Sequence, residues 1–151
     1  MKVLTRLILL FLLFSLHAQN NKLIDEFLSR EFADFNTAAY LVLVASGSAP
    51  ESLTLDQARQ KVLEANWGIT EVHASQPLNA ATLSLLIMKG LNLSGGLFYS
   101  LFGGGWYAFK EARYRQLFPA HYSPWRVLKG WEAINALTKA LEMKEAVDNA
   151  R

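Results

Sequence analysis

The most apolar internal stretch of the chain runs from Leu78 to Gly90 and carries hydrophobic side chains on nearly every face of a helix. Such a helix is buried on all sides, so we predict that it lies in the middle of the fold. Similar stretches occupy residues 35–47 and 128–140. Tyr40–Val44 would also suit a buried strand on propensity alone. Helices are favoured because a capping Asn is followed eleven residues later by Gly in two of the stretches, Asn36 with Gly47 and Asn79 with Gly90.

Further helices are predicted on either side of these stretches. Apolar residues recur at helical spacing over 22–34, and Thr54 with Gln57 has the spacing of a capping box that opens a helix ending near Gly68. Residues 106–118 and 128–147 complete the set. In the last of these helices, the pattern places Trp131 on the inner face and Glu132 on the outer face.

Leu97–Phe102 is an apolar, aromatic segment with two glycines before it and three after it. We expect a short helical turn that fills the core between two halves of the domain. The alternative is an exposed apolar segment that contacts lipid or a partner through Leu97, Phe98, Tyr99, Leu101 and Phe102.

The sequence resembles itself when it is aligned with a shifted copy, which indicates an internal repeat. A shift of 50 residues places Leu78 on Leu128, and a shift of 43 places Asn36 on Asn79. The repeating unit is a helix, a connector and a short buried helix, used about three times. Because one unit cannot bury its own apolar face, the units must pack on one another.

Two motifs resemble the S-layer homology family. Trp106-Tyr107-Ala108 with Ala112 is similar to that family's first helix, and Leu128-Lys-Gly-Trp-Glu-Ala133 is similar to its second-helix motif. The helical patterns predict a single all-α domain over residues 22–147. The resemblance, which covers about Leu23 to Leu141, implies about three helix-loop-helix repeats around a shared core and binding of anionic cell-wall glycans. This chain departs from the motif at its arginine, replaced by Thr37, Ala80 and Gly130, and at its glutamate, where Ala39 and Thr82 accompany Glu132.

The first 18 residues have the pattern of a secretory signal peptide. Lys2 and Arg6 precede an apolar run over 7–16, and Ala18 supplies a small residue for cleavage. We therefore predict an exported protein that is periplasmic or associated with the cell envelope; an uncleaved membrane anchor is the alternative. The chain has no cysteine, which excludes disulfides and thiolate metal sites.

Charge narrows the range of partners. The formal net charge is +2, and loss of residues 1–18 leaves 13 basic and 13 acidic side chains. A neutral protein lacks the positive charge with which nucleic-acid binders hold phosphates, so no nucleic-acid partner is predicted. The basic side chains are concentrated after residue 105, where a mild excess would suit an anionic ligand or merely a solvated surface.

One cluster is a candidate for binding an anionic cell-wall glycan through bidentate hydrogen bonds and stacking: Arg113, Tyr114, Arg115, Trp125 and Arg126. The competing interpretation is that Tyr114 and Trp125 are core residues and the arginines cover them.

Catalytic candidates are weak. Glu111 and Glu132 are a conceivable carboxylate pair for glycoside cleavage, and His73 and His121 fall in connectors. No motif for a nucleophile, a phosphate or a metal is present. We predict a non-enzymatic envelope module, without metal or cofactor, that binds a cell-wall polymer or another envelope protein. The alternatives are a membrane-apposed structural protein and a small hydrolase acting on peptidoglycan.

Overall fold

The computed structural model describes residues 21–150, and every regular element in this range is a helix. Residues 21–29 are helical, and they are followed by α2 (Phe35–Ala45), α3 (Leu55–Glu64), α4 (Glu71–Ser75), α5 (Ala80–Gly90), α6 (Leu97–Phe102), α7 (Gly104–Tyr114) and α8 (Gly130–Asn149). The predicted all-α class is confirmed. The strand alternative for Tyr40–Val44 is wrong because α2 contains this segment. The predicted signal peptide, residues 1–18, lies outside the described residues.

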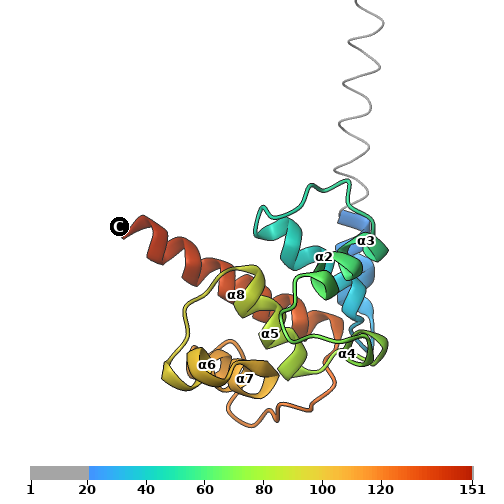
Figure 1. Ribbon diagram of the computed structural model, residues 1–151. Helices are drawn as coiled ribbons and strands as arrows, with labels where there is room; N and C mark the ends of the chain where they lie inside the picture. Colours follow the sequence, from blue (N-terminus) through green and yellow to red (C-terminus); the bar gives the residue numbers. More distant parts are fainter. Residues whose placement is uncertain (1–20, 151) are drawn as a thin grey trace, which may run out of the picture.

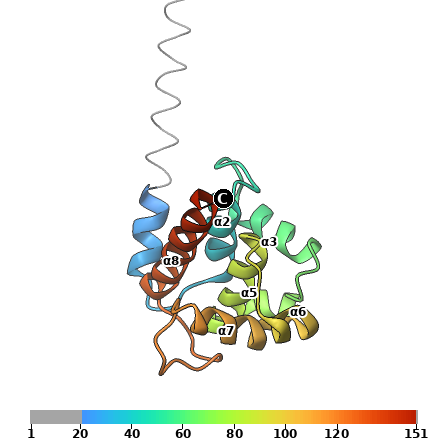
Figure 2. The same cartoon turned by 90° about the vertical axis from the view of Figure 1, so that its left-hand side faces the viewer.

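The helices α2, α5 and α8 pack against one another at the centre of the domain (Figures 1 and 2). In α5, nine of the eleven residues are buried, and the Leu86 side chain has no exposed surface. The central position predicted for this helix is therefore confirmed. Asn79 caps α5 by accepting a hydrogen bond from the Thr82 amide, as the sequence indicated.

A closed circuit of three backbone hydrogen bonds joins the segments that lead into these helices. The Ala33 amide donates to the Leu128 carbonyl (2.8 Å), the Leu128 amide to the Leu78 carbonyl (2.9 Å), and the Leu78 amide to the Ala33 carbonyl (3.0 Å). Each segment thus gives and receives one bond, which satisfies buried polar groups and fixes the starts of the three central helices relative to one another.

The cap of α2 corrects the predicted alignment of the first two stretches. Asp34, not Asn36, is its N-cap and accepts from the Thr37 amide, so Asp34 occupies the place that Asn79 has in α5. These caps are 45 residues apart, whereas the sequence comparison used 43. Thr37, rather than Ala39, therefore corresponds to Thr82. The interpretation of the chain as three repeats stays a prediction.

The remaining long helices surround this centre. α3 packs against α2, and α7 packs against α5. Residues 21–29 meet α8 where it begins: a Cβ added to Gly130 would lie 1.5 Å from the Phe27 carbonyl oxygen. No side chain fits at this point, so Gly130 lets the first described helix close against the last one.

Four helices differ from their predicted form. The first described helix stops at residue 29 instead of 34, and α3 stops at Glu64 instead of near Gly68, since Asn66 adopts a left-handed conformation with φ of 53°. α7 ends at Tyr114 instead of reaching residue 118, since Gln116 adopts a left-handed conformation with φ of 61°. In α8 the predicted faces of two neighbours are exchanged: Trp131 is 51% exposed and Glu132 only 4% exposed. The reason lies in the loop before α8, whose side chains bind the Glu132 carboxylate, as described below.

Candidate functional site

The short helix α6 is the most unusual surface feature of the domain. Its expected role as a core plug is wrong, because none of its residues is buried. Four apolar side chains are 63–69% exposed: Leu97, Phe98, Leu101 and Phe102. Contiguous exposed apolar groups are uncommon on soluble domains and mark contact sites for a partner or a membrane.

Glycines on both sides allow α6 to stand beside α7 at one end of the domain (Figures 1 and 2). Gly103 is the single residue between α6 and α7, and its φ is 60°. Gly104, the first residue of α7, has a φ of 79°. Residues with a side chain disfavour both values. The chain can therefore reverse direction within one residue.

Aromatic rings continue this surface from α6 onto α7. The ring centres of Phe98 and Phe102 are 6.4 Å apart, those of Phe102 and Tyr107 are 5.3 Å apart, and those of Tyr107 and Trp106 are 4.9 Å apart. Trp106 is itself 41% exposed. We use the term aromatic surface for six residues: Leu97, Phe98, Leu101, Phe102, Trp106 and Tyr107.

Tyr99 lies on the opposite side of α6, partly buried against the core. Its hydroxyl is buried without a hydrogen-bond partner among the described residues. Burial raises the pKa of Tyr99, and the negative charge of Glu111 raises it further. Tyr99 contributes to a pocket of about 330 Å³ between α6 and α7, which Phe98, Trp106 and Lys110 also line.

Glu111 attaches α6 to α7. Its carboxylate accepts one hydrogen bond from the Gly96 amide, at the start of α6, and another from Arg115 Nε, both at 3.0 Å. Arg115 also donates to the Ser94 carbonyl. The four-residue spacing of Glu111 and Arg115 is compatible with a helical ion pair, but the sequence offered no signal for their contacts with Gly96 and Ser94, which lie 15 and 21 residues away.

Three cations of α5 and α7 lie over aromatic rings. Lys110 Nζ is 3.8 Å from the centre of the Trp106 ring, Lys89 Nζ is 5.7 Å from that of Tyr99, and the Arg113 guanidinium carbon is 5.9 Å from that of Phe109. Attraction between a cation and the negative face of a ring holds each side chain along the protein surface.

The predicted glycan-binding residues do not form one uniform cluster. Tyr114 and Trp125 are 85% and 69% exposed, so the interpretation of them as core residues is wrong. Arg113 is exposed as well. The other two arginines are engaged within the protein, Arg115 by Glu111 and Arg126 by Glu132. Trp125 and Trp106 line one narrow cleft of about 90 Å³, together with His73.

Glu132 is the centre of a buried polar cluster. Its carboxylate accepts hydrogen bonds from Tyr122 Oη, from Arg126 Nη2 (2.8 Å) and from the Lys129 amide (2.8 Å). Burial acts to raise the pKa of Glu132, but these three bonds outweigh it and hold the pKa below its ordinary value. The cluster secures the loop before α8 and caps that helix, which is a structural role.

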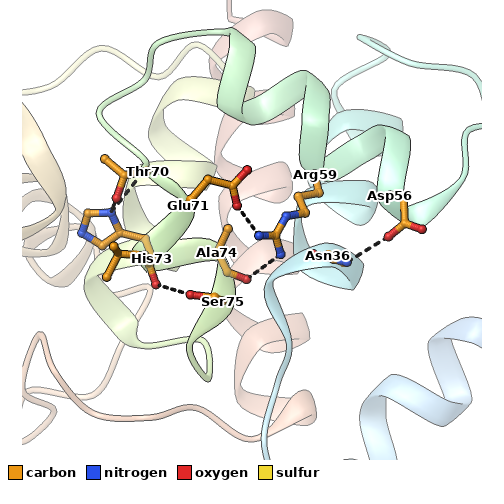
Figure 3. A network of polar contacts seen from close by, with 9 residues as sticks. Asn36, Asp56, Arg59, Thr70, Glu71, His73, Ala74 and Ser75 are labelled. Atoms are coloured by element: carbon orange, nitrogen blue, oxygen red, sulfur yellow. Dashed lines mark hydrogen bonds and ion pairs between the residues drawn. The ribbon is translucent and has the colours of Figure 1, made fainter.

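The remaining polar candidates also serve local structure. Glu111 and Glu132, the conceivable catalytic pair, are each held by an arginine. His73 lies in α4, where its Nδ1 accepts from the Thr70 amide at 3.1 Å (Figure 3). Arg59 of α3 binds both ends of this short helix, donating to the Glu71 carboxylate at its start and to the Ala74 carbonyl near its end (Figure 3). Among residues 21–150, no three His, Asp or Glu side chains are grouped to hold a metal.

No family model, curated protein or solved structure matches this chain. The resemblance to the S-layer homology family therefore stays a prediction.

Proposed function

We propose that this protein is an exported, non-enzymatic envelope module that lies against a membrane and inserts α6 into its interfacial region. The observation that supports the proposal is the exposure of Leu97, Phe98, Leu101 and Phe102 on a helix without a single charged residue. This was the second of the functions predicted from the sequence, and burial of α6 would have removed its main support.

The gain from insertion can be approximated from the exposed side chains. Complete burial of a Leu or Phe side chain is worth about 1.5–3 kcal/mol. Since roughly two thirds of each of the four is exposed, insertion would contribute about 4–8 kcal/mol in total. The cost of immobilising the protein on the bilayer offsets part of this gain. The remainder suits association that is weak and reversible.

The surroundings of α6 suit the boundary between lipid and water. Trp106 and Tyr107 belong to the residue types that concentrate at headgroup level, because their rings are apolar and their edges form hydrogen bonds. Within residues 21–150, no helix is both long and apolar enough to cross a membrane. We therefore place α6 in the interface, lying on the bilayer rather than spanning it.

The absence of cysteine from the sequence allows a direct test. A cysteine introduced by Leu101→Cys can be labelled with an environment-sensitive dye, and Val72→Cys provides a control of matched exposure, 63% against 66%. With phospholipid vesicles, the dye at position 101 should shift its emission to shorter wavelength, whereas the dye at 72 should not. The label reports insertion of α6 itself, so the result holds whether or not the N-terminal segment has been removed.

A second pair of variants measures the contribution of α6 to affinity. Phe98→Gln with Phe102→Gln should weaken sedimentation with vesicles at least tenfold, and Phe32→Gln with Val72→Gln, which alters two exposed apolar side chains elsewhere, should not. An unshifted dye at 101 together with equal sedimentation of both pairs would refute the membrane function.

Binding of an anionic cell-wall glycan is the second candidate, favoured by the exposure of Tyr114, Trp125 and Arg113. Because Arg126 is engaged by Glu132, the informative variant is Arg113→Gln with Trp125→Ala. It should reduce retention on purified wall polymer and leave binding to vesicles of phosphatidylcholine alone, which depends on the apolar side chains of α6, in place. Wild-type protein that passes through wall polymer unretained at low salt would end this candidate.

A further inference from the structure

Within residues 21–150, three cations of α5 and α7 have no negatively charged partner. Between Lys89 and Arg126 the sequence has five basic side chains and a single acidic one, Glu111. Glu111 is bound to Arg115, and Arg126 is bound to Glu132. Among residues 21–150, no carboxylate lies within ion-pair distance of Lys89, Lys110 or Arg113. Their positive charge is therefore available to a ligand.

Two of these cations flank the base of the aromatic surface. Lys89 lies over the Tyr99 ring and Lys110 over the Trp106 ring, and both rings line the pocket between α6 and α7. Arg113 follows Lys110 by one turn along α7, over the Phe109 ring. When a long basic side chain lies along apolar surface, its charged end remains at the polar boundary while the stem is buried.

From this arrangement we infer that the aromatic surface selects bilayers that contain anionic phospholipid, with Lys89, Lys110 and Arg113 contacting the headgroup phosphates. The inference rests on the proposed membrane function. If α6 enters the interface, side chains at its base reach headgroup level, where ammonium and guanidinium groups meet phosphate oxygens.

The expected size of the effect follows from the number of cations. A basic residue close to an anionic membrane surface strengthens binding by roughly fivefold, so three of them should together contribute on the order of 100-fold. The contribution should decline as salt is added, because the Debye length shortens from about 10 Å at 0.1 M to about 3 Å at 1 M. The apolar contribution of α6 has no such dependence on salt.

The test compares vesicles of phosphatidylcholine alone with vesicles in which about one third of the lipid is phosphatidylglycerol, which is anionic. Sedimentation of the full chain should be stronger with the anionic vesicles by about 100-fold at low salt, and this advantage should disappear near 1 M salt. In the triple variant Lys89→Gln, Lys110→Gln and Arg113→Gln, binding to anionic vesicles should exceed binding to uncharged vesicles by only a few fold. A matched triple variant of cations outside α5–α7, Lys22→Gln with Lys61→Gln and Lys139→Gln, should retain most of it.

The outcomes separate this inference from the function on which it rests. Equal binding to both vesicle types, or equal losses in the two triple variants, overturns the lipid selectivity, even if the dye on residue 101 reports insertion. Selective binding without insertion would instead preserve the role of the cations and refute insertion of α6. A thermal melt followed by circular dichroism excludes unfolding of the triple variants, whose altered side chains are all on the surface or half-buried.

Discussion

Replacement of Glu132 by glutamine tests how the last third of the domain is held together. The glutamate is 4% exposed, and its two oxygens accept from Tyr122, Arg126 and the Lys129 amide. Glutamine has the same shape but one acceptor oxygen, and its amide group is a donor. At least one of the three donors therefore loses its acceptor and faces another N–H group.

The expected loss of stability follows from these contacts. A hydrogen bond to a charged group contributes about 1.5–3 kcal/mol, and a buried donor without an acceptor costs about 1–3 kcal/mol. Since glutamine keeps part of the network, we expect Glu132→Gln to lower the free energy of unfolding by about 2–4 kcal/mol at pH 7. For a domain of this size, the melting temperature should fall by roughly 8–16 °C.

The pH dependence provides an independent check. Because the folded-state pKa of Glu132 lies below its ordinary value near 4.3, the ionised carboxylate stabilises the fold fully above that value. This stability is lost as the pH falls through the lower, folded-state pKa. The difference between the wild type and Glu132→Gln should therefore narrow below about pH 4.

The assay is urea unfolding followed by circular dichroism at a series of pH values, with Glu145→Gln as a control on the exposed end of α8. The control should remain within about 0.5 kcal/mol of the wild type. A loss below about 1 kcal/mol for Glu132→Gln at pH 7, or a loss that stays constant from pH 6 to pH 3, would refute the role assigned to the buried cluster.

The other two predictions concern packing. Leu86→Ala should lower the free energy of unfolding by about 2–5 kcal/mol in urea titrations, because it leaves a cavity beside a side chain with no exposed surface; an unchanged midpoint would show that α5 is not the centre of the core. Gly130→Ala should cost about 1–3 kcal/mol, although alanine normally favours a helix over glycine, because its Cβ would lie 1.5 Å from the Phe27 carbonyl oxygen. A stabilised Gly130→Ala protein would contradict the close approach of residues 21–29 to α8.

The sequence by itself determined the local elements. The capping box at Thr54, the cap Asn79 and the nearly continuous apolar residues of α5 each involve neighbours within one or two turns, and the structure has all three. The all-α class and the burial of Leu86 followed from such patterns. Local composition also identified two parts of the candidate surface: the apolar segment Leu97–Phe102 and the basic side chains after residue 105.

What the sequence left open depended on contacts between distant residues. Apolar periodicity cannot distinguish a helix that covers a core from one that faces outward, since the gain from burial exists only where a partner surface is provided. Within the described chain, the side of α6 that carries its four exposed apolar side chains has no such surface. The inward position of Glu132 was decided by Tyr122 and Arg126, which lie in the preceding loop. Likewise, Lys89 of α5 lies on the same side of the domain as the cations of α7 only because α5 packs beside α7. Tertiary packing alone placed a free positive charge at the base of the exposed apolar helix.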